Sequence, residues 1–366
     1  FQGYINNSGE LDLYRYLMMD RLANPNLQWE KTASWNLGLD FGFLKDRITG
    51  TLEYYSMQTH DMIMNERLPT FTGFKNITTN LGQVINSGVE LALSTINIQR
   101  DNFQWSTTAS FSFNRNRIKA LTYENKDDSA NGWFIDKPIS VIWNYRVTGI
   151  WQTNEVEEAA KYGQKPGDPK VANTYTADDV VHEDGSVTPT YNQNDHEFLG
   201  ETTPPIHWSL RNDFVLWKDL TVAFNIYSYM GHKSLAGFYL NNDDDGGRMA
   251  YGMANLPAKE YWTPENPTHE YGRIEAAGPT GASGAQKLYD RSFIRLDNIS
   301  VGYTLPKAWT SRYELNRVKV FGTIRNVATW AKDWEYGDPE VSPNFNDNDR
   351  GGLATRIYTL GLNLVF

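Results

Sequence analysis

The stretch RIYTLGLNLVF, residues 356–366, ends the sequence and shows the pattern that decides its fold. Its even-numbered side chains, from Tyr358 to Phe366, are large and apolar, and small or polar residues alternate with them up to Asn363. Because successive side chains of an extended strand point to opposite faces, this alternation predicts a β-strand with one apolar and one polar face.

The same alternation recurs along the chain, for example in SWNLGLDFGF (34–43), WSTTASFSFN (105–114) and LTVAFNI (220–226). Period-2 patterning of this kind, bounded by turn residues, predicts strands. The predicted strands are 34–43, 47–58, 86–98, 103–114, 141–150, 206–216, 220–230, 291–304, 317–327 and 356–366. The fold class is therefore all-β.

The connections between these strands alternate in length. Three are tight: LKDR (44–47), QRDN (99–102) and WKD (217–219). The long ones cover 59–85, 115–140, 231–290 and 328–355. Short periplasmic turns and long external loops are typical of an antiparallel outer-membrane β-barrel. If the first and last strands both run inward, the number of strands must be odd, so either an eleventh strand lies within 151–205 or one of the ten is wrong.

Composition excludes several other classes. The 366 residues carry a net charge of −10, which argues against a nucleic-acid partner, and they contain no cysteine. No apolar run approaches the roughly 18 residues of a membrane helix. A secreted all-β carbohydrate-binding or adhesin domain is the alternative to a membrane barrel. The strands are long, however, and the polar face is rich in Gly, Ser, Thr and Asn. Aromatic residues gather at strand ends, where a barrel has its interfacial girdles: Trp29, Trp35, Tyr54, Tyr55, Trp105, Trp217, Tyr303 and Trp330.

Several longer stretches resemble the SusC/RagA-type TonB-dependent transporters of Bacteroidota outer membranes. They are NPNLQWEKTASWNLGLDFGFLKDRITGTLEYYSMQTHDMI (24–63), LGQVINSGVELAL (81–93), SFIRLDNISVGYTLP (292–306), RNVATW with YGDPEV (325–341) and YTLGLNLVF (358–366). Together they cover nearly the whole chain. The stretch 166–205 departs from the family pattern, because its middle is longer than usual between Pro166-Gly167-Asp168 and Gly200.

The resemblance implies that residues 1–366 are the C-terminal part of a plugged barrel of about 22 strands. About ten or eleven of those strands would lie in this chain, and both edge strands would need partners from outside it. The plug domain and the TonB box are expected outside this chain. The implied function is TonB-dependent import of glycan or peptide oligomers across the cell outer membrane, without enzymatic activity or cofactor. The implied partners are a SusD-like lipoprotein, TonB–ExbB–ExbD, the barrel-assembly machinery and outer-membrane lipid.

Two groups of residues are candidates for function. An acidic and aromatic loop supplies amides, carboxylates and rings suited to an oligomer, and its candidate substrate-binding residues are Asn241, Asp243, Asp245, Tyr251 and Trp262. The alternative is that the aromatic residues pack against the lipoprotein or belong to a girdle. The apolar row of the last strand is predicted to be the membrane-assembly signal: Tyr358, Leu360, Leu362, Leu364 and Phe366.

Metal and catalytic sites are not expected. The six histidines are scattered without ligand spacing. NNDDDGG (241–247) is similar to the first half of a calcium loop, but the twelfth position is Gly252 rather than a bidentate glutamate. A solvated acidic external loop is the favoured interpretation of this stretch.

Overall fold

The computed structural model describes residues 2–5, 11–14, 22–68, 70–74, 76–121, 125–236, 260–274, 276–282, 285–334, 338–340 and 354–366. They divide into two compact units. The first contains residues 1–35, 56–86 and 116–137, and the second contains 36–55, 87–115 and 138–366. Four long strands contribute residues to both units, whereas the sites discussed below lie within the second.

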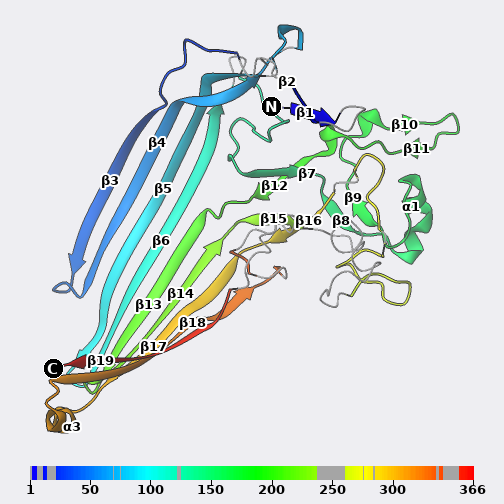
Figure 1. Ribbon diagram of the computed structural model, residues 1–366. Helices are drawn as coiled ribbons and strands as arrows, with labels where there is room; N and C mark the ends of the chain where they lie inside the picture. Colours follow the sequence, from blue (N-terminus) through cyan, green and yellow to red (C-terminus); the bar gives the residue numbers. More distant parts are fainter. Residues whose placement is uncertain are drawn as a thin grey trace. The chain divides into compact units, whose positions relative to one another are not determined.

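A nine-stranded sheet dominates the structure (Figure 1). Its order is β19-β18-β17-β14-β13-β6-β5-β4-β3. From β6 to β19, every neighbouring pair is antiparallel. The strands are β3 (Lys31–Phe43), β4 (Ile48–Arg67), β5 (Asn76–Arg100), β6 (Phe103–Ala120), β13 (Ile206–Leu216), β14 (Leu220–Met230), β17 (Phe293–Thr304), β18 (Arg317–Ala331) and β19 (Ile357–Val365). The all-β, antiparallel fold predicted from the sequence is thus confirmed.

The predicted connection 59–85 is wrong, because β4 and β5 extend into it and leave only residues 68–75 between them. The extended ends hold polar cross-strand contacts, such as the bond from Thr78 Oγ1 to Asn65 Oδ1 at 2.9 Å. The backbone ladder continues there without an alternating apolar face. A search for alternating apolar residues therefore ends β4 too early and begins β5 too late.

The predicted sheet strand 141–150 is also wrong. It divides into β7 (Val141–Asn144) and β8 (Val147–Ile150), which pair with β12 (Glu197–Glu201) and β9 (Pro169–Val171) outside the large sheet. No eleventh strand of the sheet lies within the fully described segment 151–205. The sheet therefore has nine strands, an odd number, because one of the ten predicted strands does not belong to it. The whole stretch 121–205 connects β6 to β13.

Short elements fill the long connections and the ends of the sheet. They are β1 (Gln2–Ile5), β2 (Leu11–Tyr14), β10 (Val180–Val181), β11 (Val187–Thr188), β15 (Lys233–Ala236), β16 (Lys287–Asp290), α1 (Val156–Lys161), α3 (Lys307–Thr310) and the 3₁₀ turns Thr70–Thr72, Thr153–Glu155, Thr176–Asp178, Gln193–Asp195 and Ser311–Tyr313. Across the described ranges, no helix has the length and hydrophobicity needed to cross a membrane.

Cross-strand pairing sorts the side chains of the sheet into two faces. Ser110 of β6 pairs with Ser209, which pairs with Tyr227 on the next strand. One residue along, Phe111 pairs with Trp208. The predicted sorting is therefore confirmed: Phe111, Phe224 and Leu362 share one face, and Ser110, Asn225 and Asn363 share the other.

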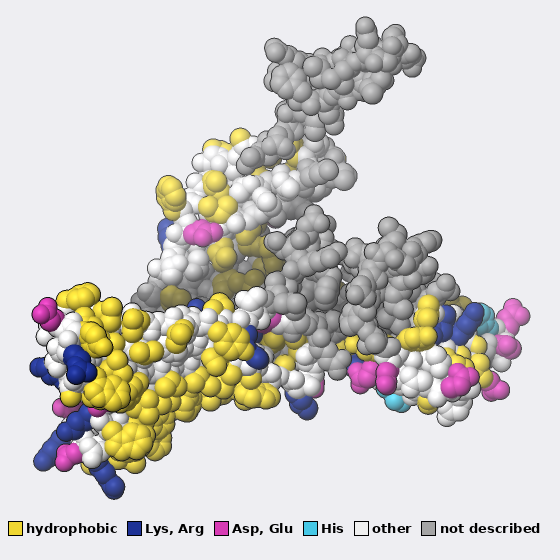
Figure 2. Space-filling model, turned by 60° about the horizontal axis from the view of Figure 1, so that its bottom comes forward, with side chains coloured by type: hydrophobic (Ala, Val, Ile, Leu, Met, Phe, Trp, Pro, Cys, Tyr) yellow, Lys and Arg dark blue, Asp and Glu magenta, His cyan; other side chains and the backbone are white. Residues whose placement is uncertain are grey.

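The apolar face is extensively exposed in the isolated chain. Leu362 is 59% exposed and Leu360 is 83% exposed. Figure 2 shows hydrophobic side chains gathered over the sheet, with charged side chains at the margin. A continuous apolar surface of this kind is unfavourable in water and favours an apolar surrounding.

The short turns at one end of the sheet have unusual backbones. Leu44, Lys45 and Asp46 have φ of 55°, 57° and 60°, and Trp217 and Lys218 have φ of 50° and 68°. The left-handed region costs an L-residue with a Cβ about 1–2 kcal/mol, which is why glycine and asparagine prevail there. These turn positions therefore carry larger side chains than the left-handed conformation favours.

Candidate functional site

The polar face of the sheet carries a hollow with a cavity volume of about 570 Å³. Residues from five strands line it, including Glu53, Glu90, Ser110, Ser209, Asn225 and Tyr227. These strands bring hydroxyl, amide, carboxylate and aromatic groups together because the period-2 pattern places every second side chain on this face. The hollow can therefore offer hydrogen bonds and ring stacking to a solute.

Hydrogen bonds between strands hold the side chains of this polar face, which we call the wall of the hollow, in place. Ser110 Oγ and Ser209 Oγ lie 2.7 Å apart. Thr51 Oγ1 donates to Asp40 at 2.7 Å, and Asn36 Nδ2 donates to Glu53 at 2.9 Å. Both carboxylates thus accept hydrogen bonds from neutral side chains. The wall keeps an acidic character on β3 and β4.

Aromatic rings border the hollow on β13 and β14. The rings of Tyr227 and Tyr229 lie 5.7 Å apart, and the ring of Tyr229 lies 4.3 Å from that of His207. Phe293 of β17 contacts both tyrosines edge to face, at 5.9 and 5.4 Å. Rings packed against one another at an angle or edge to face in this way give the polar face of the sheet a fixed amphipathic surface.

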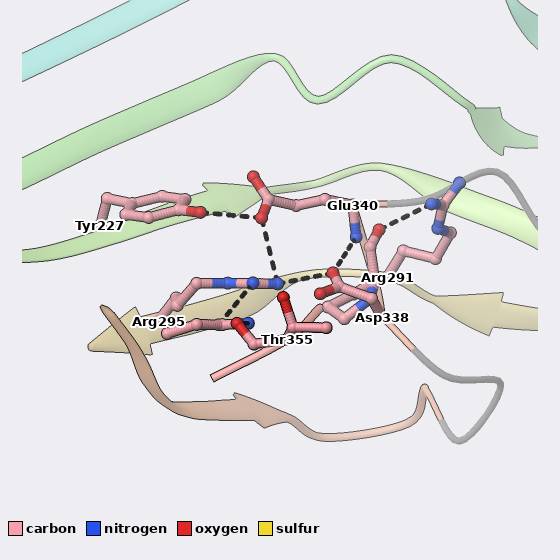
Figure 3. A network of polar contacts seen from close by, with 8 residues as sticks. Tyr227, Arg291, Arg295, Asp338, Glu340 and Thr355 are labelled. Atoms are coloured by element: carbon pink, nitrogen blue, oxygen red, sulfur yellow. Dashed lines mark hydrogen bonds and ion pairs between the residues drawn. The ribbon is translucent and has the colours of Figure 1, made fainter. Parts of the chain in front are cut away.

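Arg295 of β17 is the centre of a buried ionic network next to this wall (Figure 3). The residue is only 4% exposed. Its Nη2 lies 2.5 Å from Asp338 Oδ1 and 3.0 Å from Glu340 Oε2. Tyr227 Oη also donates to Glu340, at 2.7 Å. Two carboxylates from the connection between β18 and β19 are thereby fixed to side chains of β14 and β17.

A bulge positions the remaining partner of Arg295. The pairing of β17 with β18 shifts between Leu296 and Asn298, and Asn326 opposite it has φ of 56°. Asparagine tolerates this left-handed conformation better than most residues. The bulge directs Asn326 Oδ1 towards Arg295, whose Nη1 donates to it at 2.8 Å.

A second arginine holds the same connection. Arg291 Nη2 donates to the carbonyl oxygen of Pro339 at 2.6 Å. Its guanidinium carbon lies 4.9 Å from the ring of Trp334, which is 5% exposed. Residues 338–340 are therefore held by two ion pairs with Arg295, by a hydrogen bond from Tyr227 and by a hydrogen bond from Arg291 to the backbone. We call Arg291, Arg295, Asp338 and Glu340 the loop anchor.

The long connections contain a small folded unit with its own core. Its buried cluster comprises Tyr145, Val171, Tyr191, Ala282 and Ala285. Asp195 is fully buried and accepts bonds from three backbone N–H groups, those of Thr174, Tyr175 and Asn192. Burial lowers the pKa of His196, which lies against Trp143 and Tyr145, whereas neighbouring Asp195 raises it.

The predicted substrate-binding residues Asn241, Asp243, Asp245 and Tyr251 lie outside the described residues, as does the calcium-like stretch 241–247. Trp262 is described and is 5% exposed. It packs with Ile150, and its Nε1 donates to Gln152 Oε1 at 3.0 Å. Contact between Trp262 and a substrate stays a prediction.

The predicted assembly signal forms one exposed row on β19. Tyr358, Leu360, Leu362 and Leu364 alternate with residues of the polar face and are 69%, 83%, 59% and 42% exposed. Phe366 follows at 82%. Its role in assembly stays a prediction.

None of the four residues of the loop anchor was predicted from the sequence to be functional. Arg295 interrupts the apolar positions of FIRLDNIS, and Asp338 and Glu340 belong to YGDPEV. An arginine within a strand that also carries Leu296 and Ile299 needs a counter-charge, which is a signal the sequence contains. The identity of the partner depends on a contact between residues 43 positions apart, which no local pattern reveals.

Known proteins resemble this chain over nearly its whole length. TonB-dependent receptor P3 of Formosa agariphila is 26% identical over 373 residues, which cover 96% of this chain and 35% of that protein. TonB-dependent receptor SusC of Bacteroides thetaiotaomicron is 26% identical over 369 residues, covering 97% and 34%. The chain thus spans about a third of the length of these curated relatives.

Among solved structures, the RagAB peptide transporter superposes with a TM-score of 0.68 at 22% identity, covering 99% of this chain and 38% of that one. The RagAB peptide importer in its open-open state gives 0.69 at 21% identity. These likenesses show a shared fold. The family described as TonB dependent receptor-like, beta-barrel matches residues 3–198. Because this match extends over more than half of the residues, the chain belongs to the TonB-dependent receptor β-barrel family.

Proposed function

We propose that this chain forms part of an outer-membrane transporter that imports glycan or peptide oligomers with energy supplied through TonB. One observation carries the proposal: the nine-stranded antiparallel sheet has an apolar outer face and a face of hydroxyl, amide, carboxylate and aromatic groups. Lipid suits the first face and a hydrated solute suits the second. The activity is gated passage, so no catalytic residues are assigned.

The hollow on the polar face supports an oligomeric substrate. Its volume of about 570 Å³ lies in the range of sites for small ligands. Tyr227 and Tyr229 can stack on sugar rings or on apolar peptide side chains. Glu53, Glu90 and Asn225 can accept hydrogen bonds from hydroxyl or amide groups. Both substrate classes fit this chemistry, and RagAB, of similar fold, is described as a peptide transporter.

We further propose that residues outside 1–366 complete the barrel and supply the plug and TonB box. The strands β3 and β19 lie at opposite edges of the sheet, and within the described residues each pairs with one sheet neighbour. Unpaired backbone groups at membrane depth are costly in lipid, so each edge needs a further strand. The curated relatives, about three times as long, have room for these parts.

A SusD-like lipoprotein is the proposed partner at the outer surface. The long connections from β6 to β13 and from β14 to β17 begin and end at the strand ends opposite the short turns, where an external partner would sit. The barrel-assembly machinery is the proposed receptor of the β19 row. TonB–ExbB–ExbD would act through the proposed TonB box outside residues 1–366.

The test is uptake by cells of the source organism from which the gene for this transporter is deleted. Uptake of labelled glycan and peptide oligomers should fall to background, return with the intact gene, and cease when an uncoupler removes the proton-motive force. The protein should appear in the outer-membrane fraction and need detergent for extraction. A soluble secreted product with unchanged uptake would instead support the carbohydrate-binding or adhesin alternative.

A further inference from the structure

Two carboxylates lie opposite each other on the neighbouring strands β4 and β5 (Figure 1). Two cross-strand contacts fix the antiparallel register of these strands: the hydrogen bond from Ile96 N to Arg47 O at 2.8 Å, and the approach of Gly88 to the ring of Tyr55. Counting in register from either contact places Glu53 opposite Glu90. Both residues line the hollow on the polar face.

This arrangement is unfavourable for the strand pair itself, because like charges directly opposite each other destabilise a sheet. Glu53 accepts a hydrogen bond from Asn36, a neutral group, and Glu90 is exposed. Within the part of the chain that the structure describes, no lysine or arginine lies within ion-pair distance of either glutamate. A cation between the two carboxylates would remove the repulsion.

The other charges on this face of the second unit do not supply that cation. Arg211 is paired with Asp213 at 2.7 Å, and Arg295 is held by the two carboxylates of the loop anchor. Asp40, which accepts a bond from Thr51, adds a further acid. The remaining cations at polar-face positions lie outside the lining of the hollow: Arg47, Arg100, Arg317, Lys319 and Arg325. The lining itself contains two glutamates, one histidine and no lysine or arginine.

Aromatic rings lie on the side of the hollow away from the glutamates. The strand order places β4 and β5 on one side and β13 and β14 on the other, with β6 between them. Ser112 of β6 pairs with His207 of β13, which in turn pairs with Tyr229 of β14. Rings suit the apolar stem or ring of a solute, and carboxylates suit a cationic group at its end. The hollow is thus complementary to an amphipathic cation.

We propose that Glu53 and Glu90 together bind an ammonium or guanidinium group of the transported oligomer, an inference that rests on the proposed transport function. The cation belongs to a basic side chain of a peptide or to an amino sugar of a glycan. It accepts charge-assisted hydrogen bonds to both carboxylates, which are stronger than bonds between neutral groups. The hollow thereby selects cationic oligomers and disfavours those that carry carboxylate or sulfate groups.

The experiment measures the affinity of the full-length transporter in detergent for two pairs of oligomers, whose members differ only in the acetylation of amines. One pair is an N-acetylated hexapeptide with a single lysine and the same peptide with acetyl-lysine. The other is a glucosamine hexamer and an N-acetylglucosamine hexamer. By isothermal titration, the parent should bind the cationic member of at least one pair roughly tenfold more tightly, the factor expected for two exposed ion pairs. The preference should shrink at high salt.

The test variant is Glu53→Gln with Glu90→Gln, which keeps polar side chains and removes both charges. Its affinity for the cationic oligomer should fall roughly tenfold, to that for the acetylated one. The matched control is Glu157→Gln with Glu183→Gln, which removes two exposed acids from the connection between β6 and β13. The control should keep the parental preference.

A second variant separates ligand binding from sheet stability. Glu90→Lys places a cation opposite Glu53, so it should unfold in detergent at a higher temperature than the parent, because opposite charges stabilise a strand pair. It should also lose the preference for cationic oligomers. A lower unfolding temperature would mean that the paired carboxylates serve the fold, and would overturn the inference.

The two pairs of oligomers identify the source of the cation. A preference confined to the peptides supports the inference with a basic side chain as the ligand, and one confined to the glycans supports it with an amino sugar. Equal binding within both pairs would overturn it, as would a preference that persists in the test variant or disappears in the control. If cells import neutral oligomers and the parent shows no charge preference, only this inference fails. If they import no oligomer, the proposed function fails with it.

Discussion

At the scale of single residues, Arg295 shows how this wall holds a connection in place. A guanidinium buried at 4% exposure is tolerated because two carboxylates, an amide and a tyrosine surround it. Removing one partner of such a buried pair leaves the other charge uncompensated, which is far costlier than never having formed the pair. The loop anchor is therefore strong as a constraint on position even where its net contribution to stability is small.

Replacing Arg295 with methionine should destabilise the folded protein by about 3–5 kcal/mol, because Asp338 and Glu340 remain without their cation. The free energy of unfolding in detergent measures the loss. Limited proteolysis should show faster cleavage within 332–356. Arg325→Met, an exposed arginine of the neighbouring strand, is the matched control and should change stability by less than about 1 kcal/mol. Equal effects of both substitutions would contradict the assignment of Arg295 as an anchor.

His232 should make stability depend on pH. Burial, with smaller effects of Arg291 and His207, lowers its pKa to about 4, against an opposing effect of Asp290. The unfolded imidazole titrates near pH 6.5, so between those values the unfolded chain binds a proton that the folded chain does not. Stability is complete above pH 6.5 and falls by roughly 2–3 kcal/mol towards pH 4.

Thermal unfolding of His232→Gln at pH 7 and pH 4.5 checks this assignment. The variant should lose much of the decrease in midpoint that the parent shows on acidification. His182→Gln, at an exposed histidine, serves as the control and should keep the parental decrease. A parental decrease in His232→Gln would assign the acid sensitivity to other groups.

At the scale of the strand, one residue of register decides on which face of the sheet a side chain lies. Phe111 and Ser110 are neighbours in β6, yet they belong to opposite faces. Phe111→Arg should cost roughly 2–4 kcal/mol near the membrane midplane, whereas Ser110→Arg places its charge in the hydrated interior and should be far milder. Unfolding in lipid vesicles measures both variants. The reverse order of sensitivity would mean that the faces are exchanged.

The last strand makes a second prediction at this scale. Deleting Phe366, which ends the exposed row of β19, should reduce the amount of assembled protein in the outer membrane more than deleting Glu183, which lies in the link between β10 and β11. The expected reason is loss of the apolar terminal row that the barrel-assembly machinery would bind. Heat-modifiable migration on gels measures assembly. Equal assembly of the two variants would exclude a special role for Phe366.

At the scale of the whole molecule, the short turns and the long connections should lie on opposite sides of the membrane. The natural absence of cysteine makes single-cysteine variants clean reporters. An impermeant maleimide added to intact cells should label Glu183→Cys, in the β10–β11 link, and should label Asp101→Cys, in the β5–β6 turn, only after the outer membrane is opened. If Asp101→Cys alone were labelled in intact cells, the short turns would lie on the outside, and the topology would be the reverse of the one expected.

The sequence by itself determined the strands and their faces. Alternation in β6, β13, β14 and β19 is a local property, because a strand exposed to two different media must change polarity at every residue. The strands β13, β14 and β19 therefore have nearly the predicted bounds, whereas β6 continues six residues beyond the predicted 103–114 to Ala120. The sorting of Phe111 from Ser110 follows directly. Alternation failed to mark two other stretches. In the extended ends of β4 and β5 the apolar residues do not alternate with polar ones, as in Met62-Ile63-Met64, and the apolar residues of 141–150 serve the core of a separate small unit.

Only the tertiary structure decided which distant residues meet. Asp338 lies 43 residues from Arg295 and reaches it from the connection between β18 and β19, while a bulge in β18 directs Asn326 to the same arginine. The left-handed conformation of Trp217 and Lys218 was likewise set by closure of the hairpin against the preference of those residues. Alternation fixes the face on which a side chain lies, whereas its contacts depend on chain closure and bulges, which involve segments far apart in sequence.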